Sequence, residues 1–413
     1  MRSTLTQSGK KTGLWLIGAG GNIAATVAIG LHAIQRKLAS PIGLVTELPE
    51  LRRLSLVPIS AITLGGHEVR KQGVTESARD LHLRSGLFSE SLLRKLGPQL
   101  GRFQRNIRPG TSAGAGRAVK KFASAGSVDA GKSGRSIIDR LRKDLRNFKK
   151  RNRLDRVVVI NVASTEPLVR RISVGDHWAK LDASLAKTQR PAIPASSLYA
   201  IAAIEELMPF VNFTPSVGAD LPAIRELADR QGVPIMGSDG KTGETLLKSV
   251  LAPMFVERNL EILSWDGHNI LGNLDGRVLA DPDSKASKLK SKGNVVGSIV
   301  GYEPQTPVSI EYVESLHDWK IAWDHIHFRG FLGTRMSVQF TWQGSDSILA
   351  APLIIDLARL ADFHAAQGLG GAMTHLGCFF KSPMDVDEHR FSGQVNALHR
   401  YVAEHSTRRG ARR

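Results

Sequence analysis

Cysteine is almost absent from this sequence, which has one, Cys378, among 413 residues. A single thiol cannot form an internal disulfide or supply a cysteine-based metal cluster. Disulfide-stabilised secreted domains are therefore excluded, and so low a cysteine content is typical of a reducing compartment. We expect a cytoplasmic protein whose length allows a large core and two domains.

Uninterrupted apolar runs of membrane-spanning length are also lacking. Lys10 and Lys11 precede the run TGLWLIGAGGNIAATVAIG, which imitates a signal peptide, but glycines and Asn22 interrupt it and no clear cleavage site follows. The second run, SILAAPLIIDLARLADF, carries Asp356 and Arg359. Because charges of this kind are rare in a membrane span, we expect a core helix there and no membrane segment.

Acidic residues are outnumbered, and the net charge is +18. Residues 102–156 hold 17 Lys and Arg against 4 Asp. Such a stretch can bind nucleic acid or attract an anionic substrate. Aromatic residues that could stack on bases are scarce there, so we favour a solvated helix face and keep nucleic-acid binding as the alternative.

Strands and helices alternate along most of the chain. GLWLIGAG and RVVVINVAST are apolar strands, and RSIIDRLRKDLRNFKKR is an amphipathic helix between them. This alternation predicts a parallel doubly wound sheet. After residue 293 the strands PVSIEYVE and RMSVQFTWQG alternate as antiparallel strands do, and residues 102–132 indicate a mobile loop or a poorly packed insertion.

The stretch GSVDAGKSG, residues 126–134, matches the phosphate-binding pattern G-x-x-x-x-G-K-[ST]. That loop needs a buried strand before it, a helix after it, and a second strand ending in an aspartate for Mg²⁺. The preceding RAVKKFASA is charged, and RVVVINVAST has no aspartate at its end. We therefore interpret the match as accidental, and Lys132 as a surface residue.

A better phosphate site follows the first strand, where Gly18, Gly20 and Gly21 lead into a helix. Glycines there allow a tight turn and close approach of a pyrophosphate to the helix N-terminus. An acid for the ribose hydroxyls normally follows a later strand. Glu47 and Glu68 are the two candidates.

Further polar loops follow in order along the chain. Asp239, Lys241 and Thr242 come after a strand, and Asn269, Asn273 and Asp275 are expected in a polar turn. Lys288 and Lys292 fall on one helical face, where like charges destabilise the helix unless an anion lies between them. The remaining loops contain Asp318, Lys320, Asp346 and Lys381.

Taken in order, these loops resemble the inositol-3-phosphate synthase family over about residues 13–385. The segments that correspond to the family's motifs, in the family's order, are GAGGN (18–22), GGHE (65–68, with Glu68 where the family has aspartate), ASTE (163–166), DGKTG (239–243), LGNLD (271–275), SKLKSK (287–292), HDWK (317–320), SDSILAAP (345–352) and FFKSP (379–383). The resemblance implies an NAD-binding Rossmann-like doubly wound sheet with an inserted α+β catalytic and oligomerisation domain. The implied division is 13–245 for the NAD-binding domain, including a basic loop at about 102–135, 246–347 for the insertion, 348–400 for the return, and 401–413 for a basic tail.

The resemblance also implies an activity, a redox-neutral isomerase of the intramolecular lyase type that serves inositol and phospholipid biosynthesis. Glucose 6-phosphate is oxidised at C5 by NAD, closed by an aldol step between C6 and C1, and reduced again at C5, giving 1D-myo-inositol 3-phosphate. The implied catalytic residues are Lys288, Lys292, Lys320, Lys381 and Asp275. The implied cofactor-binding residues are Gly18, Gly20, Gly21, Asn22, Ile23, Glu68, Thr165, Asp239, Thr242, Asp318 and Asp346.

Some positions depart from the family pattern. Leu274 replaces an asparagine and Trp319 replaces a serine, and both positions lie near cofactor or substrate in the family. The exact sugar phosphate is therefore left open, with a related cyclase for another sugar phosphate as the alternative. A homotetramer is implied, and a monovalent or divalent cation is left open.

Overall fold

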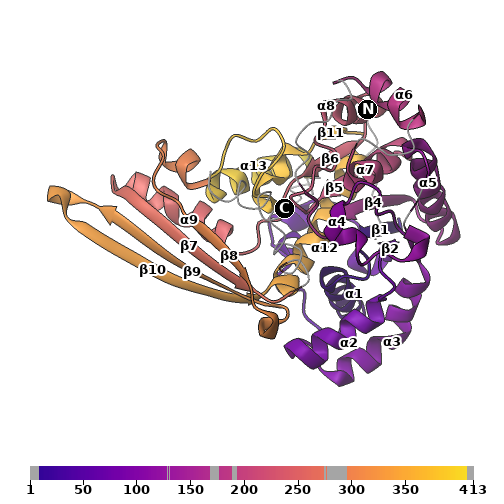
Figure 1. The fold of residues 1–413 in the computed structure, drawn as a ribbon, viewed down its shortest axis with the longest axis horizontal. Coiled ribbons are helices and arrows are strands. Elements are labelled where there is room, and N and C mark those ends of the chain that lie inside the picture. The colour runs from indigo at the N-terminus through magenta and orange to yellow at the C-terminus, as the bar shows by residue number, and fades with distance from the viewer. Residues whose placement is uncertain are drawn as a thin grey trace, which may run out of the picture.

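The computed structural model describes residues 9–127, 129, 131–167, 176–187, 193–273, 276 and 295–406. Two sheets organise this part of the chain. A seven-stranded sheet with helices on both faces forms the body, and a four-stranded sheet extends from it as an arm (Figure 1).

The seven-stranded sheet is parallel throughout and has the order β11-β6-β5-β4-β1-β2-β3. Its central strands are apolar runs buried on both faces, as the sequence predicts, because helices cover each side. This order contains the 3-2-1-4-5-6 arrangement of dinucleotide-binding folds. The strands are β1 (Thr12–Ile17), β2 (Ile62–Glu68), β3 (Ile107–Pro109), β4 (Arg156–Asn161), β5 (Phe210–Asn212), β6 (Pro234–Gly237) and β11 (Gly371–Ala372).

The helices pack as two groups around this sheet. One group is built on the contact between α1 and α12, and the other on contacts of α5 and α8 with α7. The described helices are α1 (Asn22–Gln35), α2 (Val74–Ser85), α3 (Glu90–Arg105), α4 (Gly116–Lys120), α5 (Gly134–Arg151), α6 (Trp178–Lys187), α7 (Ala195–Glu205), α8 (Pro222–Gln231), α9 (Glu244–Glu257), α12 (Asp346–Ala366) and α13 (Phe391–His405).

Helix α12 is the charged core helix that the sequence predicts. Asp362, fully buried, accepts hydrogen bonds from Thr12 at 2.8 Å and from Arg156 Nε at 2.7 Å. Asp356 accepts bonds from Val45 N and Thr46 N. Its charges thus hold distant segments of the body together, and no helix in the described part of the chain is long and apolar enough to cross a membrane.

The four-stranded sheet has the order β10-β9-β7-β8. Its strands are β7 (Glu261–Leu271), β8 (Val308–Tyr312), β9 (Trp319–Arg329) and β10 (Arg335–Ser345). The antiparallel expectation is correct for β10 but wrong for β8, which runs parallel to β7. The sheet lies between α9 and α12 in the chain, consistent with an insertion. The predicted boundaries at 245/246 and 347/348 remain a proposal.

The expectation of a mobile or poorly packed insertion over residues 102–132 is wrong. This stretch completes α3, adds β3 to the edge of the parallel sheet, and contains the short helix α4. Phe103 is buried in the main core. The basic composition of this stretch did not reveal its helices and strand, because Lys and Arg on one face of a helix do not show whether the opposite face is packed.

Candidate active site

A pocket lies at the carboxyl ends of the parallel strands, around the point between β1 and β4 where the strand order reverses. Ligands bind at this point in open α/β sheets. About 1580 Å³ of empty space, open to solvent at its mouth, separates its walls. The ends of β1, β2, β4, β5 and β6 form one side, and Asn273, Lys320, Asp346 and Lys381 come from elsewhere in the chain.

The turn after β1 is held by backbone contacts that glycine makes possible. Gly18 has φ +90°, and a Cβ on it would lie 2.9 Å from the backbone of Ala163. The amides of Gly18 and Ala19 donate to the His67 carbonyl at 2.9 and 3.0 Å. These contacts hold the turn in a single backbone conformation, and the turn leads directly into α1.

Gly21 is the N-cap of α1, with no side chain capping the helix. Gly21, Asn22 and Ile23 line the pocket, so this helix end faces it and can receive a pyrophosphate. Gly20 is also required for packing. A Cβ on Gly20 would lie 2.6 Å from the Gln72 carbonyl oxygen and 2.8 Å from Glu68 Oε2, so only glycine fits against the end of β2.

Glu68, at the end of β2, is the acid beside the glycine turn. Its Oε2 accepts from Gly20 N at 2.7 Å, and its Oε1 accepts from Val69 N and Arg70 N at 2.9 Å. The other candidate, Glu47, is excluded, because it pairs with Arg359 and lies outside the pocket.

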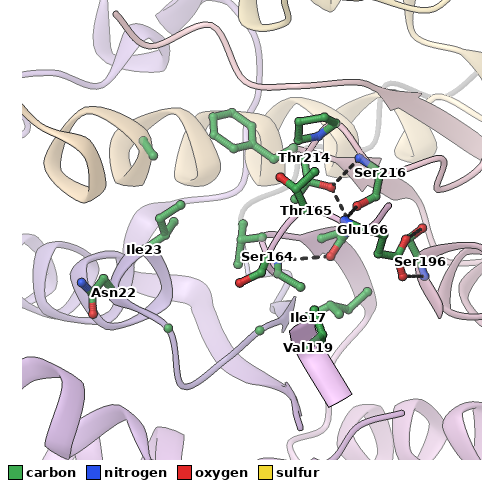
Figure 2. Close-up of a pocket in the computed structure, with 18 of the residues that line it drawn as sticks. Ile17, Asn22, Ile23, Val119, Ser164, Thr165, Glu166, Ser196, Thr214 and Ser216 are labelled. Carbon is green, nitrogen blue, oxygen red and sulfur yellow. Dashed lines mark hydrogen bonds between the residues drawn. The ribbon is translucent and has the colours of Figure 1, made fainter. Parts of the chain in front are cut away.

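Polar groups from the ends of β4 and β5 and from the start of α7 surround Glu166 (Figure 2). Ser196 donates to its carboxyl from both N and Oγ, and Glu166 N donates to Ser216 Oγ at 3.1 Å. Burial raises the pKa of Glu166 to about 7, although these hydrogen bonds oppose the shift. Thr165 lies beside it on the pocket wall, so Glu166 anchors the loop that carries this expected cofactor residue.

Asp318 connects the glycine turn to the start of α12. It accepts from Asn22 Nδ2 at 3.0 Å and from the hydroxyls of Ser345 and Ser347 at 2.6 Å. Burial raises the pKa of Asp318, and the serine hydrogen bonds act in the opposite direction. Asp346, next along, accepts from Asn273 Nδ2 at 3.1 Å.

Lys381 and Asp239 form a nearly buried ion pair with a 2.8 Å contact between Nζ and Oδ1. Backbone hydrogen bonds join residues 238–241 to 379–382 as a short antiparallel ribbon, which fixes the pair in place. Thr242 lines the pocket just after this ribbon. Lys320 reaches the same pocket from β9, and no hydrogen bond or ion pair joins its Nζ to any residue the structure describes.

Lys241, in the same motif, points away from the pocket. Its Nζ donates to Gln394 of α13 and lies 6.0 Å from the Phe391 ring centroid. Burial lowers its pKa to about 8. Lys241 therefore connects the ribbon to α13, which is a structural role that the sequence motif did not predict.

The sequence analysis missed two polar side chains that share one face of the arm and do not line the pocket. Asn269 lies in β7 and not in a turn, and it is fully buried. Ala322 separates it from Trp342 across the sheet. Among the described residues, neither the Asn269 amide nor Trp342 Nε1 has a hydrogen-bond partner. Buried polar groups without a partner draw attention to these two residues, and such groups can be recognised only in the structure.

Three expected catalytic residues, Asp275, Lys288 and Lys292, lie outside the described residues, as does Leu274. Trp319 does not line the pocket, because its indole donates to the Ser85 carbonyl at 3.0 Å. Lys132 pairs with Asp129 at 3.0 Å, also outside the pocket.

Metal ligands do not gather anywhere in the described part of the chain, where no group of three or more His, Cys, Asp or Glu is placed to hold an ion. Half of the basic residues of α5 form ion pairs with described residues. Arg135 contacts Asp182 and Glu205, and Arg142 contacts Glu206 at 2.7 Å. These contacts neutralise part of the basic segment within the protein.

Comparisons with known proteins agree with this geometry. An inositol-3-phosphate synthase of Bacteroides thetaiotaomicron is 33% identical over 94% of this chain and 93% of its own. An Arabidopsis thaliana isozyme is 30% identical over 85% of this chain and 74% of its own. Among solved structures, inositol-3-phosphate synthase of Caenorhabditis elegans has a TM-score of 0.85 at 24% identity, covering 97% of this chain and 87% of that one.

A Thermotoga maritima protein related to myo-inositol-1-phosphate synthase shares the fold as well, with a TM-score of 0.77 at 21% identity, over 95% of this chain and 98% of that one. The family model of myo-inositol-1-phosphate synthase matches residues 12–403. This chain therefore belongs to the myo-inositol-1-phosphate synthase family.

Proposed function

We propose that this protein converts D-glucose 6-phosphate to 1D-myo-inositol 3-phosphate with no net consumption of NAD. The observation that carries the proposal is the meeting of two groups in one pocket. The glycine turn of a dinucleotide fold lies on one side, and the lysines 320 and 381 reach in from the other. A dehydrogenase needs the first group, whereas holding a sugar phosphate and stabilising oxyanions also needs the second.

The residues around the glycine turn fit NAD. Backbone contacts under 3 Å would meet any Cβ at Gly18 or Gly20, and the uncapped end of α1 faces the pocket. When bound, NAD would supply a hydride acceptor and donor. Asn22 and Asp318, joined by a 3.0 Å hydrogen bond, would orient the cofactor beside this turn.

The lysines would act on the sugar phosphate. Asp239 holds the Lys381 ammonium inside the pocket wall, so this cation is preorganised toward the substrate. Lys320 is a donor for a phosphate or an oxyanion. Lys288, Lys292 and Asp275 complete the proposed set by family resemblance, with Lys292 as the proton carrier.

The arm offers further donors near Lys320. The N-terminus of α9 has no side-chain cap, and Trp342 Nε1 lies 3.2 Å from the position of a Cβ on Gly243, the N-cap of that helix. An anion at this helix end would satisfy groups that are otherwise costly to bury. We propose that the substrate phosphate binds on this side of the pocket.

We also propose a cytoplasmic homotetramer that assembles through the arm. Phe331 and Leu332, in the β9–β10 turn, are 87% and 86% exposed, and Trp323 is exposed on the outer face of β9. Exposed apolar surface of this kind marks an interface. A monovalent or divalent cation requirement remains open, and inositol and phospholipid synthesis are the proposed uses of the product.

The test is a product assay on purified protein with glucose 6-phosphate and NAD. We expect inositol phosphate to accumulate without a matching rise in NADH, and we expect NAD(H) to be released when the protein is denatured. NADH that rises in proportion to product would instead indicate a simple dehydrogenase. The same assay with other hexose phosphates separates this proposal from a cyclase that acts on another sugar.

A further inference from the structure

The carboxylate of Glu68, at the end of β2, accepts an unusually large number of hydrogen bonds. Glu68 is 7% exposed, and its two oxygens accept five hydrogen bonds. Three come from backbone amides, and two come from Arg70 Nε and Nη2 at 3.2 and 3.3 Å. A carboxylate has about four lone-pair sites. Glu68 is thus fully engaged in holding the turn and Arg70.

Arg70 itself faces the dinucleotide side of the pocket. It belongs to the pocket wall with Glu68 and Val69, and its Nη2 lies 3.9 Å from the position of a Cβ on Gly21. A guanidinium carries five N–H donors in a planar fork. Two of them point to Glu68, which leaves donors on the far edge of the fork for a ligand.

We propose that Arg70 makes this site accept a dinucleotide with a phosphate on the adenosine 2′-oxygen, NADP, in addition to NAD. The inference rests on the proposed function only in that a dinucleotide binds at the glycine turn. In dinucleotide folds, an acid after the second strand bonds the 2′-hydroxyl of NAD, and a nearby arginine accommodates the 2′-phosphate of NADP. This chain has both residues, and they are bonded to each other.

The charge arrangement explains why both cofactors fit. An unpaired carboxylate at this position would repel a 2′-phosphate, and discrimination would be strong. Here the negative charge of Glu68 is compensated by the Arg70 guanidinium and directed toward backbone amides. The guanidinium can bond a phosphate through its remaining donors while it stays paired with Glu68.

The experiment is a calorimetric titration of cofactor-stripped protein with NAD⁺ and with NADP⁺, in the absence of sugar phosphate. For the unmodified protein, we expect the two dissociation constants to agree within about tenfold. Arg70→Ala should weaken NADP⁺ binding by about 10- to 100-fold and NAD⁺ binding by much less, because only NADP⁺ loses a charged hydrogen bond. Arg70→Lys should restore part of the loss.

Arg94→Ala is the matched control. Arg94 also faces a glutamate, Glu90, but it is 75% exposed on α3 and outside the pocket, so both affinities should stay unchanged. NAD⁺ binding with no detectable NADP⁺ binding overturns this inference and leaves the proposed function intact. Equal loss of both cofactors in Arg70→Ala also overturns it. If neither dinucleotide binds, the proposed function fails as well.

Discussion

The glycine turn of the body and the arm of this molecule treat buried polar groups differently. Around the glycine turn, the polar atoms are satisfied: Glu68 accepts five hydrogen bonds, and Asp318 accepts four from Asn22, Ser345 and Ser347. On the inner face of the arm, Asn269 and Trp342 have buried polar atoms without a partner among the described residues. Around the glycine turn the acceptors are thus paired within the protein, whereas these two groups of the arm are not paired with any described residue.

This difference has a physical reason. A rigid turn binds a dinucleotide with little ordering cost, because preorganised donors need no rearrangement. Groups that bind a reacting sugar work best when they bond charge that develops during the reaction. The arm should therefore respond to substitution mainly through catalysis, and the body mainly through cofactor binding.

Lys320→Ala should have the largest effect on turnover, and it is the most direct test of whether the arm serves catalysis and the body serves cofactor binding. Loss of one donor to a developing oxyanion typically lowers turnover roughly 10²–10³-fold. We expect product formation to fall by that amount while NAD binding, measured by calorimetry, stays unchanged. Lys143→Ala, at an exposed position of α5, is the control. Equal losses of NAD binding and turnover would show that the arm and the body do not divide the work.

Lys248→Met tests whether the arm tolerates an uncompensated charge. Lys248 is 1% exposed, with Glu244 Oε1 at 2.7 Å and Asp324 Oδ1 at 3.8 Å. Breaking a buried pair by removing one partner typically costs about 3–5 kcal/mol. Urea unfolding should show a loss of this size.

The double variant Glu244→Gln with Lys248→Met should recover part of that stability, because it also removes the buried negative charge that Lys248 compensates. An unchanged unfolding midpoint in the single variant would mean that water reaches this cluster.

Acid should weaken the contact between α12 and α13 in the body. Burial lowers the pKa of His364 from 6.5 to about 4 and that of His375 to about 3. Their rings pack with Tyr401, and the nearby His405 adds to the shift. Since the unfolded state binds protons more readily below pH 6.5, the stability that these neutral rings provide is lost as the pH falls toward about 4.

The variant His364→Gln with His375→Gln should therefore lose less stability than the unmodified protein between about pH 7.5 and pH 5, by about 1–2 kcal/mol per histidine. Glu166 and Asp356, whose pKa values burial raises to about 7 and about 6, contribute the opposite slope in both proteins, so the comparison cancels them. If the free energy of unfolding changes with pH in the same way for both proteins, the two histidines do not cause the loss of stability in acid.

Lys132→Ala should have the smallest effect. Its half-exposed Nζ contacts the buried carboxylate of Asp129, which also pairs with Arg140 at 2.9 Å and so keeps a cationic partner in the variant. We expect stability within about 0.5 kcal/mol of the unmodified protein. Turnover should be unchanged, and no ATP hydrolysis should be detected. A large fall in turnover would reopen GSVDAGKSG as a phosphate site.

The parallel sheet and its glycine turn were predictable because buried parallel strands are continuous apolar runs and the turn has a recognisable motif. Strands β7 and β9 were not predicted. They carry polar residues on both faces, such as His268 opposite Trp323 and Gly267 opposite Asp324, so their alternation is weak. The inward direction of Asn269 and the outward direction of Lys241 depend on packing between distant segments, which no local pattern encodes.

The hydrogen bond from Thr12 to Asp362 joins two segments that are synthesised at very different times. Strand β1 leaves the ribosome early, yet its partner on α12 follows 350 residues later. At roughly 5–20 residues per second, β1 waits about 20–70 s for this contact. Its neighbours in the sheet, β2 and β4, are synthesised much sooner and pair with β1 along its whole length. The body should therefore reach its final packing only after α12 has left the ribosome, although the centre of its sheet can form earlier.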